Sequence, residues 1–557
     1  MKKSLIIAVI ALAASFFTTG CIKETNPMTS TVTVAQAAAA PGAYQNFVDA
    51  ITSSLCGQFT YGGSNNYPWD FGYPSFFLMR DVMGNDIVCE TSGSEWYSTW
   101  YACGTGLGPD YAVCQLPWTY YYKWIKNCNV VLSMYKADPT EDKEAGAGIA
   151  YAMRAMFYMD MARMFCPTTY GADKEAITVP LVLDDTESSA LMSNPRATNE
   201  VMWNQIIADL DEAEKLIAGY SRPDKYTPDL SVVYGLKARA YLTMENWSEA
   251  RNYAKKAQSG YTLMTSAQYH DQKTGFNTPN DSWMFALTFK ADDPNILNND
   301  ADSCWGSQMI IEVSESGCGY SANYVGPKRI DYHLFQTIPD TDWRKTCWVD
   351  FDIDDLGSKA AIVEALSAYS DSPEGLYATG YTHSTTKSYV GGMPVKFRPK
   401  DGEHADQYKA FTVAVPLMRV EEMYLIEAEA AGMMNEGEGK ALLEAFAKTR
   451  DASYKYGDHT DTYYNSKTPM FQNEVWWQRR VELWGEGFAT FDIKRLQKGI
   501  IRSYPDSNHP EDNRWNSETT PQWMTLCIVR TETNYNKACE QNPTPIKPTQ
   551  DSDEYTW

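Results

Sequence analysis

Apolar side chains recur every three or four positions along several stretches of the chain, and this spacing predicts amphipathic helices. In the clearest case, Val233, Leu236 and Ala240 form one apolar stripe within residues 231–243. Thr198 stands where the N-cap of another helix is expected. The full set of predicted helices covers residues 121–135, 149–165, 198–217, 231–243, 248–257, 419–434, 439–451 and 473–484.

Two of these helices, at residues 231–243 and 248–257, follow each other with only a short turn between them, and we expect Ser248 to cap the second. Such a pair of short helices resembles one tetratricopeptide unit of about 34 residues. A second pair is predicted at residues 419–434 and 439–451. The two pairs lie far apart in the sequence, which excludes a simple tandem array.

Long stretches between the helices show no helical period and are rich in glycine, asparagine and aromatic residues. They cover residues 55–117, 265–415 and 502–557. Within them, residues 283–289 and 308–313 are short apolar runs typical of strands. The sequence therefore predicts a mainly α fold, in which tetratricopeptide-like helix pairs form a scaffold for a long, irregular, loop-rich capping region with a few short strands. Loops of this length usually have a function.

The first residues have the features of a secretory signal peptide. Lys2 and Lys3 precede an apolar run of 13 residues, which is too short to cross a membrane core that needs about 20. The run ends shortly before Cys21, in a context that resembles the processing box of bacterial lipoproteins, where the cysteine carries lipid. The alternative is an ordinary cleaved signal peptide followed by a chance cysteine.

The sequence thus predicts a lipoprotein signal peptide at residues 1–20, lipid-bearing Cys21 with a flexible tether in residues 21–43, and a single domain at residues 44–557. Two charged residues just after Cys21 resemble the short export tag of Bacteroidetes surface lipoproteins. We therefore expect a protein that is anchored in the outer membrane through its N-terminal lipid and faces the cell exterior.

The chain carries 71 acidic and 48 basic residues, a formal net charge of −23, which becomes −25 once the two lysines of the signal peptide are removed. Nucleic acid is a disfavoured partner, because phosphates require stripes of lysine and arginine. Of the 12 cysteines, Cys103 and Cys114 flank a glycine-rich loop, so a disulfide between them is one interpretation. Small buried thiols are the favoured interpretation for most of the cysteines.

Residues 419–431 resemble the helix that marks the SusD/RagB family of Bacteroidetes outer-membrane lipoproteins, and residues 479–487 with 491–496 are similar to a late motif of that family. Residues 541–543 resemble the closing signature, although the Gly-Tyr that usually follows is missing. The shared order and spacing of the motifs carry the resemblance. Further matches lie at residues 154–158, 179–181, 195–198, 206–213, 237–242 and 247–250.

The resemblance implies one large α-helical fold with four tetratricopeptide-like pairs. It also implies that the protein captures a glycan at the cell surface and serves as a lid on a SusC-like TonB-dependent transporter. In this family the glycan platform draws on loops of the first loop-rich region and on loops after the middle helix pair. We expect no catalytic residue, no cofactor and no metal.

Flat aromatic rings bury the apolar face of a sugar at low entropic cost, while polar side chains bind its hydroxyl groups. Aromatic residues make up 13% of the chain, and those on loops are the better candidates, because helix-borne Trp124, Tyr158 and Trp203 are expected in the core. For each loop ring, packing under a loop is the alternative. The candidate glycan-binding residues are Tyr67, Trp69, Arg80, Trp96, Tyr97, Trp100, Trp305, Tyr320 and Tyr324, with Asn65, Asn66 and Asp86 as further polar partners.

Glu482 and Glu486 raise the question of glycoside hydrolysis. They lie four residues apart on one face of a predicted helix, whereas hydrolysis needs carboxylates on opposite sides of a sugar. A structural salt-bridge network with neighbours such as Arg480 and Asp492 is favoured instead. The acidic stretch at residues 292–302 lacks the calcium-loop pattern and is interpreted as a solvated loop.

Three functions follow from these observations. The favoured one is a non-catalytic glycan-binding lipoprotein that delivers its ligand to a transporter. The second is a RagB-like scaffold on the same fold that binds peptides or proteins or serves in adhesion. The third is a surface glycosidase.

Overall fold

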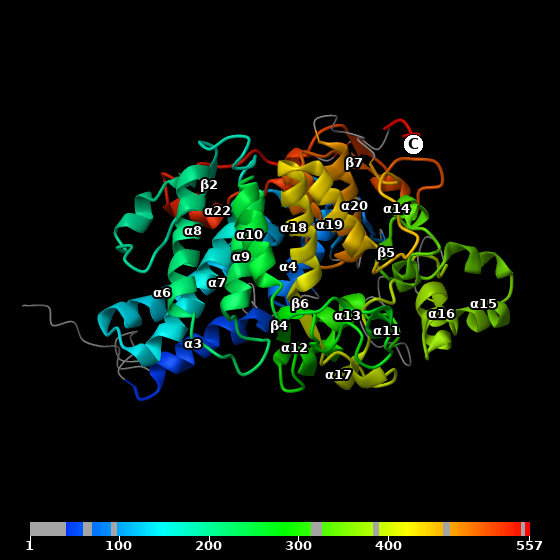
Figure 1. Ribbon diagram of the computed structural model, residues 1–557, viewed down its shortest axis with the longest axis horizontal. Coiled ribbons are helices and arrows are strands. Elements are labelled where there is room, and N and C mark those ends of the chain that lie inside the picture. The colour runs from blue at the N-terminus through cyan, green and yellow to red at the C-terminus, as the bar shows by residue number, and fades with distance from the viewer. Residues whose placement is uncertain are drawn as a thin grey trace, which may run out of the picture. The chain divides into compact units, whose positions relative to one another are not determined.

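The computed structural model of the protein describes residues 40–58, 69–90, 97–313, 326–382, 389–460, 468–546, 548 and 552–557 (Figure 1). The chain divides into two units, Met1–Asn46 and Phe47–Trp557. The described part of the first unit contains the start of helix α3 (Ala43–Ser53). Cys21 lies outside the described residues, and the boundaries at residues 20 and 43 stay predictions.

The scaffold of the second unit is formed by α6 (Ala112–Ala137), α7 (Glu141–Phe165), α8 (Asn199–Leu216), α9 (Leu230–Thr243), α10 (Trp247–Ala257), α18 (Val420–Met434), α19 (Glu436–Ala447) and α20 (Met470–Glu482). Each of the helices from α6 to α10 packs against the next one (Figure 1). α10 then packs on α18, which is far away along the chain, and α18 packs on α19 and α20. The predicted helical scaffold and both predicted helix pairs are therefore confirmed.

Side chains at the ends of the helices determine where they begin. Thr198 caps α8 as predicted, because its hydroxyl accepts a hydrogen bond from the backbone N–H of the third helical residue. α10 differs from expectation: Asn246, rather than Ser248, accepts the corresponding bond. The helix therefore begins at Trp247, one residue earlier than the sequence suggested.

Two glycines set the close approach of α18 and α19. A Cβ atom on Gly439 would overlap the backbone of Gly432, and one on Gly432 would overlap the ring of Phe471 in α20. The absence of side chains at both positions lets the three helices meet around an apolar cluster. Its buried members are Leu425, Ala428, Leu443, Phe446, Phe471 and Val475.

Short antiparallel ladders connect distant parts of the second unit. β4 (Trp283–Thr288) pairs with β6 (Ala414–Arg419), and β1 (Ile87–Val88) pairs with β5 (Arg329–Ile330). The strand predicted at residues 283–289 is thereby confirmed. The other ladders join β2 (Ile177–Pro180) to β3 (Arg196–Thr198) and β7 (Ile500–Ile501) to β8 (Asn516–Ser517).

The capping region is built from short helices before, between and after the scaffold helices. They are α4 (Tyr73–Val82), α5 (Ser98–Tyr101), α11 (Ser266–Tyr269), α12 (Pro294–Leu297), α13 (Trp305–Met309), α14 (Tyr332–Thr337), η8 (Phe351–Leu356), α15 (Lys359–Leu366), α16 (Pro373–Thr382), α17 (Gln407–Ala410), α21 (Ala489–Arg495) and α22 (Arg530–Tyr535). α15 and α16 pack together as a hairpin. This hairpin is fixed by an apolar cluster that includes Ile353, Ile362, Leu366, Leu376 and Val390.

The strand predicted at residues 308–313 is wrong. Gln308 and Met309 end helix α13, and the apolar residues after them form no ladder within the described part of the chain. Ile311 is buried in the cluster under the α15–α16 hairpin, and its carbonyl oxygen accepts a hydrogen bond from Thr379 at 2.8 Å. The residues of this run are apolar because they pack against other buried side chains. The hydroxyl of Thr379 takes the place of a hydrogen-bond partner from a neighbouring strand.

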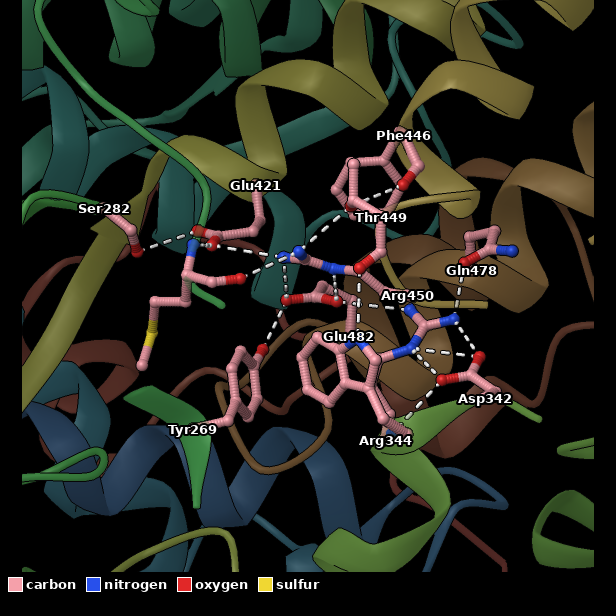
Figure 2. A network of polar contacts seen from close by, with 12 residues as sticks. Tyr269, Ser282, Asp342, Arg344, Glu421, Phe446, Thr449, Arg450, Gln478 and Glu482 are labelled. Carbon is pink, nitrogen blue, oxygen red and sulfur yellow. Dashed lines mark hydrogen bonds and ion pairs between the residues drawn. The ribbon is translucent and has the colours of Figure 1, made fainter. Parts of the chain in front are cut away.

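A network of buried charges lies where α18 and α20 meet the capping region (Figure 2). The Glu482 carboxylate is fully buried and accepts hydrogen bonds from Arg450 at 3.1 Å and from Arg344 and Arg419 at 3.2 Å each. The hydroxyl of Tyr269 also donates to it, from the side opposite Arg344 in Figure 2. Three guanidinium groups therefore share one buried carboxylate.

The neighbouring charges are paired in the same way. Glu486 contacts the ammonium of Lys396 at 2.7 Å, and Asp492 contacts the guanidinium of Arg479 at 2.7 Å. Arg480 pairs with Asp86 at 2.6 Å, which makes Asp86 a structural residue rather than the exposed sugar contact that we expected. The interpretation of this charged cluster as a structural network is confirmed.

We expect the stability of the fold to fall steeply below about pH 4.5. Burial alone would raise the pKa of Glu482, but the charges of Arg450, Arg419 and Arg344 hold it well below its ordinary value of 4.5. A carboxylate with a lowered pKa stabilises the fold above the pKa of the unfolded chain, and this contribution is lost as the pH falls. Urea unfolding midpoints between about pH 7 and pH 3 check this. A midpoint that does not change over this range would contradict it.

The cysteines of the described residues are free and buried. The thiol of Cys103 donates to the backbone oxygen of Trp100 at 2.9 Å, and that of Cys114 donates to Leu107 at 2.7 Å. Burial raises the pKa of the Cys103 thiol to about 12, so the thiol is unreactive at neutral pH. The disulfide between Cys103 and Cys114 is not formed, and small buried thiols are the correct interpretation of this pair.

Candidate functional site

Three of the predicted platform residues lie in the core. Trp69 meets Trp100 edge-on, with ring centroids 6.2 Å apart, and Tyr97 packs on Trp100 at 5.3 Å. All three side chains are at most 3% exposed. This corrects the expectation that their rings offer an exposed surface, because the chain here forms short helices, α4 and α5, that pack inward.

Arg80 and Trp305 are buried as well. The Arg80 guanidinium donates to a backbone carbonyl of the chain after α20 and lies 3.4 Å from the carboxylate of Asp160. Trp305 packs edge-on against Phe77 and Phe397, with centroids 6.2 and 5.3 Å away. Both side chains support the core below the capping region, which again corrects the expectation of direct sugar contact.

The other candidates, Tyr67, Trp96, Tyr320 and Tyr324, lie outside the described residues. So do the polar candidates Asn65 and Asn66, and their roles stay predictions. The ends of the chain that lead into these segments are described, however. They show where on the fold the segments attach.

The segments that carry these candidates attach to one small region. Glu90 comes directly before one segment and Gly326 directly after another, and a Cβ atom on Gly326 would lie 3.1 Å from the Cγ of Glu90. Trp69 and Tyr97 follow the remaining segment ends, and both pack on the same tryptophan of α5. Described residues that border the gaps at 59–68, 91–96 and 314–325 therefore pack against Trp100 or against each other.

Residues 383–388, which the structure also does not describe, end beside the same region. The next residue, Tyr389, lies with its ring over the guanidinium of Arg329 at 3.9 Å. Arg329 also donates to the backbone oxygen of Tyr389 at 2.9 Å and forms an ion pair with Glu90. Tyr389 is thereby tied to the β1–β5 ladder.

An open cavity of about 460 Å³ lies next to this region. Its volume falls within the range of about 300–1,000 Å³ that is typical of small-ligand pockets. Two other pockets in the described part of the chain measure about 20 Å³ each, the space of a water molecule. The residues that line the large cavity are Tyr332, Phe351, Asp354, Tyr389, Asp506, Ser507 and Asn508.

Two aromatic rings of the cavity wall begin short helices. Tyr332 is the first residue of α14 and Phe351 the first of η8, and each follows an aspartate that caps its helix. Their rings meet edge-on with centroids 4.9 Å apart. The Phe351 ring also lies on Gly391 and Gly392, where any Cβ atom would come within 2.7 Å of it. Glycine at these positions is what allows the ring to pack flat on the backbone.

Asp354 holds the third ring in place. Its carboxylate accepts hydrogen bonds from the hydroxyl of Tyr381 at 2.6 Å and from the backbone N–H groups of Val390 and Gly391 at 2.9 and 2.8 Å. These bonds fix the backbone directly after Tyr389. The base of the α15–α16 hairpin therefore positions one wall of the cavity.

Residues 504–509, which include the lining residues Asp506, Ser507 and Asn508, are docked on the start of α14. The side chain of Asn508 accepts from the backbone N–H of Tyr332 and donates to the carbonyl of Ile330, both at 2.9 Å. The carboxylate of Asp331 accepts from the hydroxyl of Tyr504 at 2.5 Å and from the N–H of the third α14 residue at 2.8 Å. Loop and helix thus form one rigid unit.

Asp331 also lies beside a buried histidine. Nε2 of His509 is 3.2 Å from the Asp331 carboxylate. Nδ1 of His509 is 2.5 Å from the hydroxyl of Tyr101 in α5. Burial lowers the pKa of His509, and Asp331 opposes this without cancelling it, so the ring is neutral at neutral pH.

The cavity combines aromatic rings with carboxylate, amide and hydroxyl groups, the set of side chains that binds sugars. Among the described residues, no group of three or more side chains has the arrangement of a metal site. Tyr332, Phe351 and Tyr389 were not among the candidates predicted from the sequence. For the first two, a local signal existed, because an aromatic residue directly follows a capping aspartate within a loop-rich stretch.

Comparison with known proteins assigns the family. A family model described as "SusD family" matches residues 250–546, more than half of the chain. The chain belongs to the SusD family. A second model of the SusD-like group, described as "Starch-binding associating with outer membrane", matches residues 84–242. None of the curated proteins matches the chain at a significant level.

Solved structures of SusD-like proteins share the fold. A SusD-like carbohydrate binding protein from Bacteroides vulgatus is 23% identical, with a TM-score of 0.68 over 89% of this chain and 97% of that chain. A SusD superfamily protein from Bacteroides thetaiotaomicron is 20% identical, with a TM-score of 0.65 over 92% and 100%. A laminarin binding SusD-like protein is 17% identical, with a TM-score of 0.59 over 90% and 98%. None of the described helices of this chain is long and apolar enough to span a membrane.

Proposed function

We propose that this SusD family protein is a non-catalytic binding protein that captures a glycan at the cell surface. The observation that carries the proposal is the open cavity of about 460 Å³ with Tyr332, Phe351 and Tyr389 in its walls. Aromatic faces bury the C–H surface of sugar rings, and the polar groups of Asp506, Ser507 and Asn508 lie within the same lining.

The candidates from the sequence that lie outside the described residues remain part of the proposal. Tyr67, Trp96, Tyr320 and Tyr324 are the candidates for further sugar contacts. Trp69, Tyr97, Trp100, Arg80 and Trp305 are buried, so we propose for them a structural role rather than direct sugar contact. The names of two related structures, carbohydrate binding and laminarin binding, support a glycan as the ligand class.

We further propose that lipid on Cys21 anchors the protein in the outer membrane, and that a SusC-like TonB-dependent transporter receives the glycan. The family description as outer-membrane associated supports the first step. A cavity that is open to solvent suits the second, because a ligand that must be handed on has to leave readily.

Replacing Tyr332 and Tyr389 together with alanine is expected to weaken glycan binding at least about tenfold, because each ring contributes about 0.5–1.5 kcal/mol beyond the area it buries. The measurement is affinity electrophoresis of the purified protein in gels that contain members of a polysaccharide panel. Tyr535→Ala, which removes a 69% exposed ring outside the cavity lining, is the matched control and should migrate like wild type.

Other outcomes separate the remaining functions. If no polysaccharide retards the wild-type protein, the glycan proposal fails, and the peptide- or protein-binding scaffold of the RagB type takes its place. If the purified protein releases reducing sugars with sustained turnover, the non-catalytic part of the proposal fails. Unchanged retardation of a folded Tyr332→Ala/Tyr389→Ala variant would show that the cavity is not the site.

A further inference from the structure

The charged side chains of the cavity lining are both acidic. Asp354 and Asp506 are carboxylates, and the other polar members, Ser507 and Asn508, are neutral. No lysine, arginine or histidine belongs to the described lining. The described side chains that line the cavity therefore include two carboxylates and no cation.

The charge of Asp354 is not neutralised by its own partners. The donors to its carboxylate are the hydroxyl of Tyr381 and the backbone N–H groups of Val390 and Gly391, and all of them are uncharged. These donors hold the carboxylate in place and bring no positive charge to it.

Asp506 adds a second charge at the rim. It is exposed on the turn of residues 504–509 and has a φ of 63°, a backbone conformation that holds it at the tip of the turn. The hydrogen bonds and ion pairs of the described residues include none to its carboxylate. A free carboxylate at the mouth of a cavity repels an approaching anion before any contact forms.

Two described cations lie close to the cavity without belonging to its lining. Arg514 donates to the backbone oxygen of Ser507 at 2.7 Å. Arg329 lies behind the ring of Tyr389, at 3.9 Å, and forms an ion pair with Glu90. The undescribed segment before Tyr389 contains one lysine, Lys387. The chain as a whole carries a net charge of −23, so its long-range field has the same sign as the cavity.

We infer that the cavity accepts sugar units that are uncharged or carry an amine, and that it excludes units that carry a carboxylate or a sulfate. This inference rests on the proposed function and names the ligand class of the same site. Aromatic stacking and hydroxyl contacts are available to any sugar, so the two carboxylates decide between sugars of different charge. Uronic acids and sulfated sugars would have to bring an anion beside Asp354 and Asp506.

The test compares one glycan with its own charged derivative. A neutral polysaccharide that retards the full-length protein is oxidised at C6, which turns the primary hydroxyl into a carboxylate and leaves the backbone and its linkages unchanged. We expect the oxidised form to bind about tenfold more weakly at low ionic strength, and the difference to shrink as salt is added. Asp506→Asn should recover about threefold of this loss. Glu187→Gln, which removes an exposed charge outside the lining, should recover none.

The possible outcomes separate the charge preference of the cavity from glycan capture itself. If the oxidised glycan binds as tightly as the neutral one, or if an anionic polysaccharide binds better than its carboxyl-reduced form, the charge rule is overturned while glycan capture stands. If Asp506→Asn and Glu187→Gln behave alike, the discrimination does not arise in this cavity, and the inference is likewise overturned. If neither neutral nor charged glycans bind, the proposed function fails and the inference fails with it.

Discussion

Replacing Glu482 with glutamine is expected to lower the free energy of unfolding by about 3–5 kcal/mol, the cost of removing one partner from a buried ionic network. Glutamine keeps the volume of the side chain but takes away the charge that Arg344, Arg419 and Arg450 share. Three guanidinium groups that are at most 2% exposed would then face too little negative charge. The measurement is the shift of the urea unfolding midpoint relative to wild type.

The control is a glutamate whose ion pair is exposed. Glu444 pairs with Lys448 at 3.0 Å, and its side chain is 39% exposed, so Glu444→Gln should cost less than about 0.5 kcal/mol. Both substitutions remove one negative charge, so the difference between their effects on stability reports the contribution of burial. Equal and small effects of both substitutions would refute the idea that the network at Glu482 organises the junction of α18, α20 and the capping region.

The helical scaffold was predictable because amphipathic spacing reports directly on packing. The helix expected at residues 231–243 is α9, Leu230–Thr243, and its partner begins one residue before the expected position. Helix-borne Trp124, Tyr158 and Trp203 are buried as predicted. Each of these conclusions needs only a local pattern, the recurrence of apolar residues at every third or fourth position.

The prediction for the first loop-rich region, residues 55–117, was wrong because helix α4 within it lacks the polar face that makes a helix recognisable. Every residue of α4 (Tyr73–Val82) is buried, so this helix has no polar face and shows no amphipathic period. A sequence rich in glycine and aromatic residues, without such a period, looks like a loop. Trp69, Tyr97 and Trp100 were therefore expected at the surface, whereas they pack around the end of this helix in the core.

The cavity could not be found from any one stretch of sequence. Its walls come from α14, from η8, from the residue after 383–388 and from residues 504–509, which are brought together by the β1–β5 ladder and by side-chain bonds. β1 and β5 contain two residues each, too few to leave a pattern. Tertiary contacts between distant segments carry no local signal. The residue types therefore predicted a ligand chemistry, but no local pattern predicted the place of the cavity.

Asp331→Asn is expected to weaken glycan binding about tenfold and to lower the free energy of unfolding by about 1–3 kcal/mol. Asp331 is 3% exposed, and its carboxylate joins α14, which carries Tyr332, to the loop of Tyr504 that carries other lining residues. Burial alone would raise its pKa, yet contacts with His509 and Tyr504 lower it, so the group is charged and its bonds are strong. Affinity electrophoresis and urea unfolding give the two readouts.

A variant that is merely less stable would also lose glycan binding. A second buried aspartate that caps a helix therefore serves as the control. Asp342 is 2% exposed, caps another short helix and pairs with Arg344, but it does not line the cavity. Asp342→Asn should therefore lower stability to a similar or larger extent while glycan affinity stays at the wild-type value. If both variants lose affinity equally, Asp331 has no special role in positioning the site. If only Asp331→Asn loses affinity, the bond network that it centres holds the two walls of the cavity at the separation that the ligand requires.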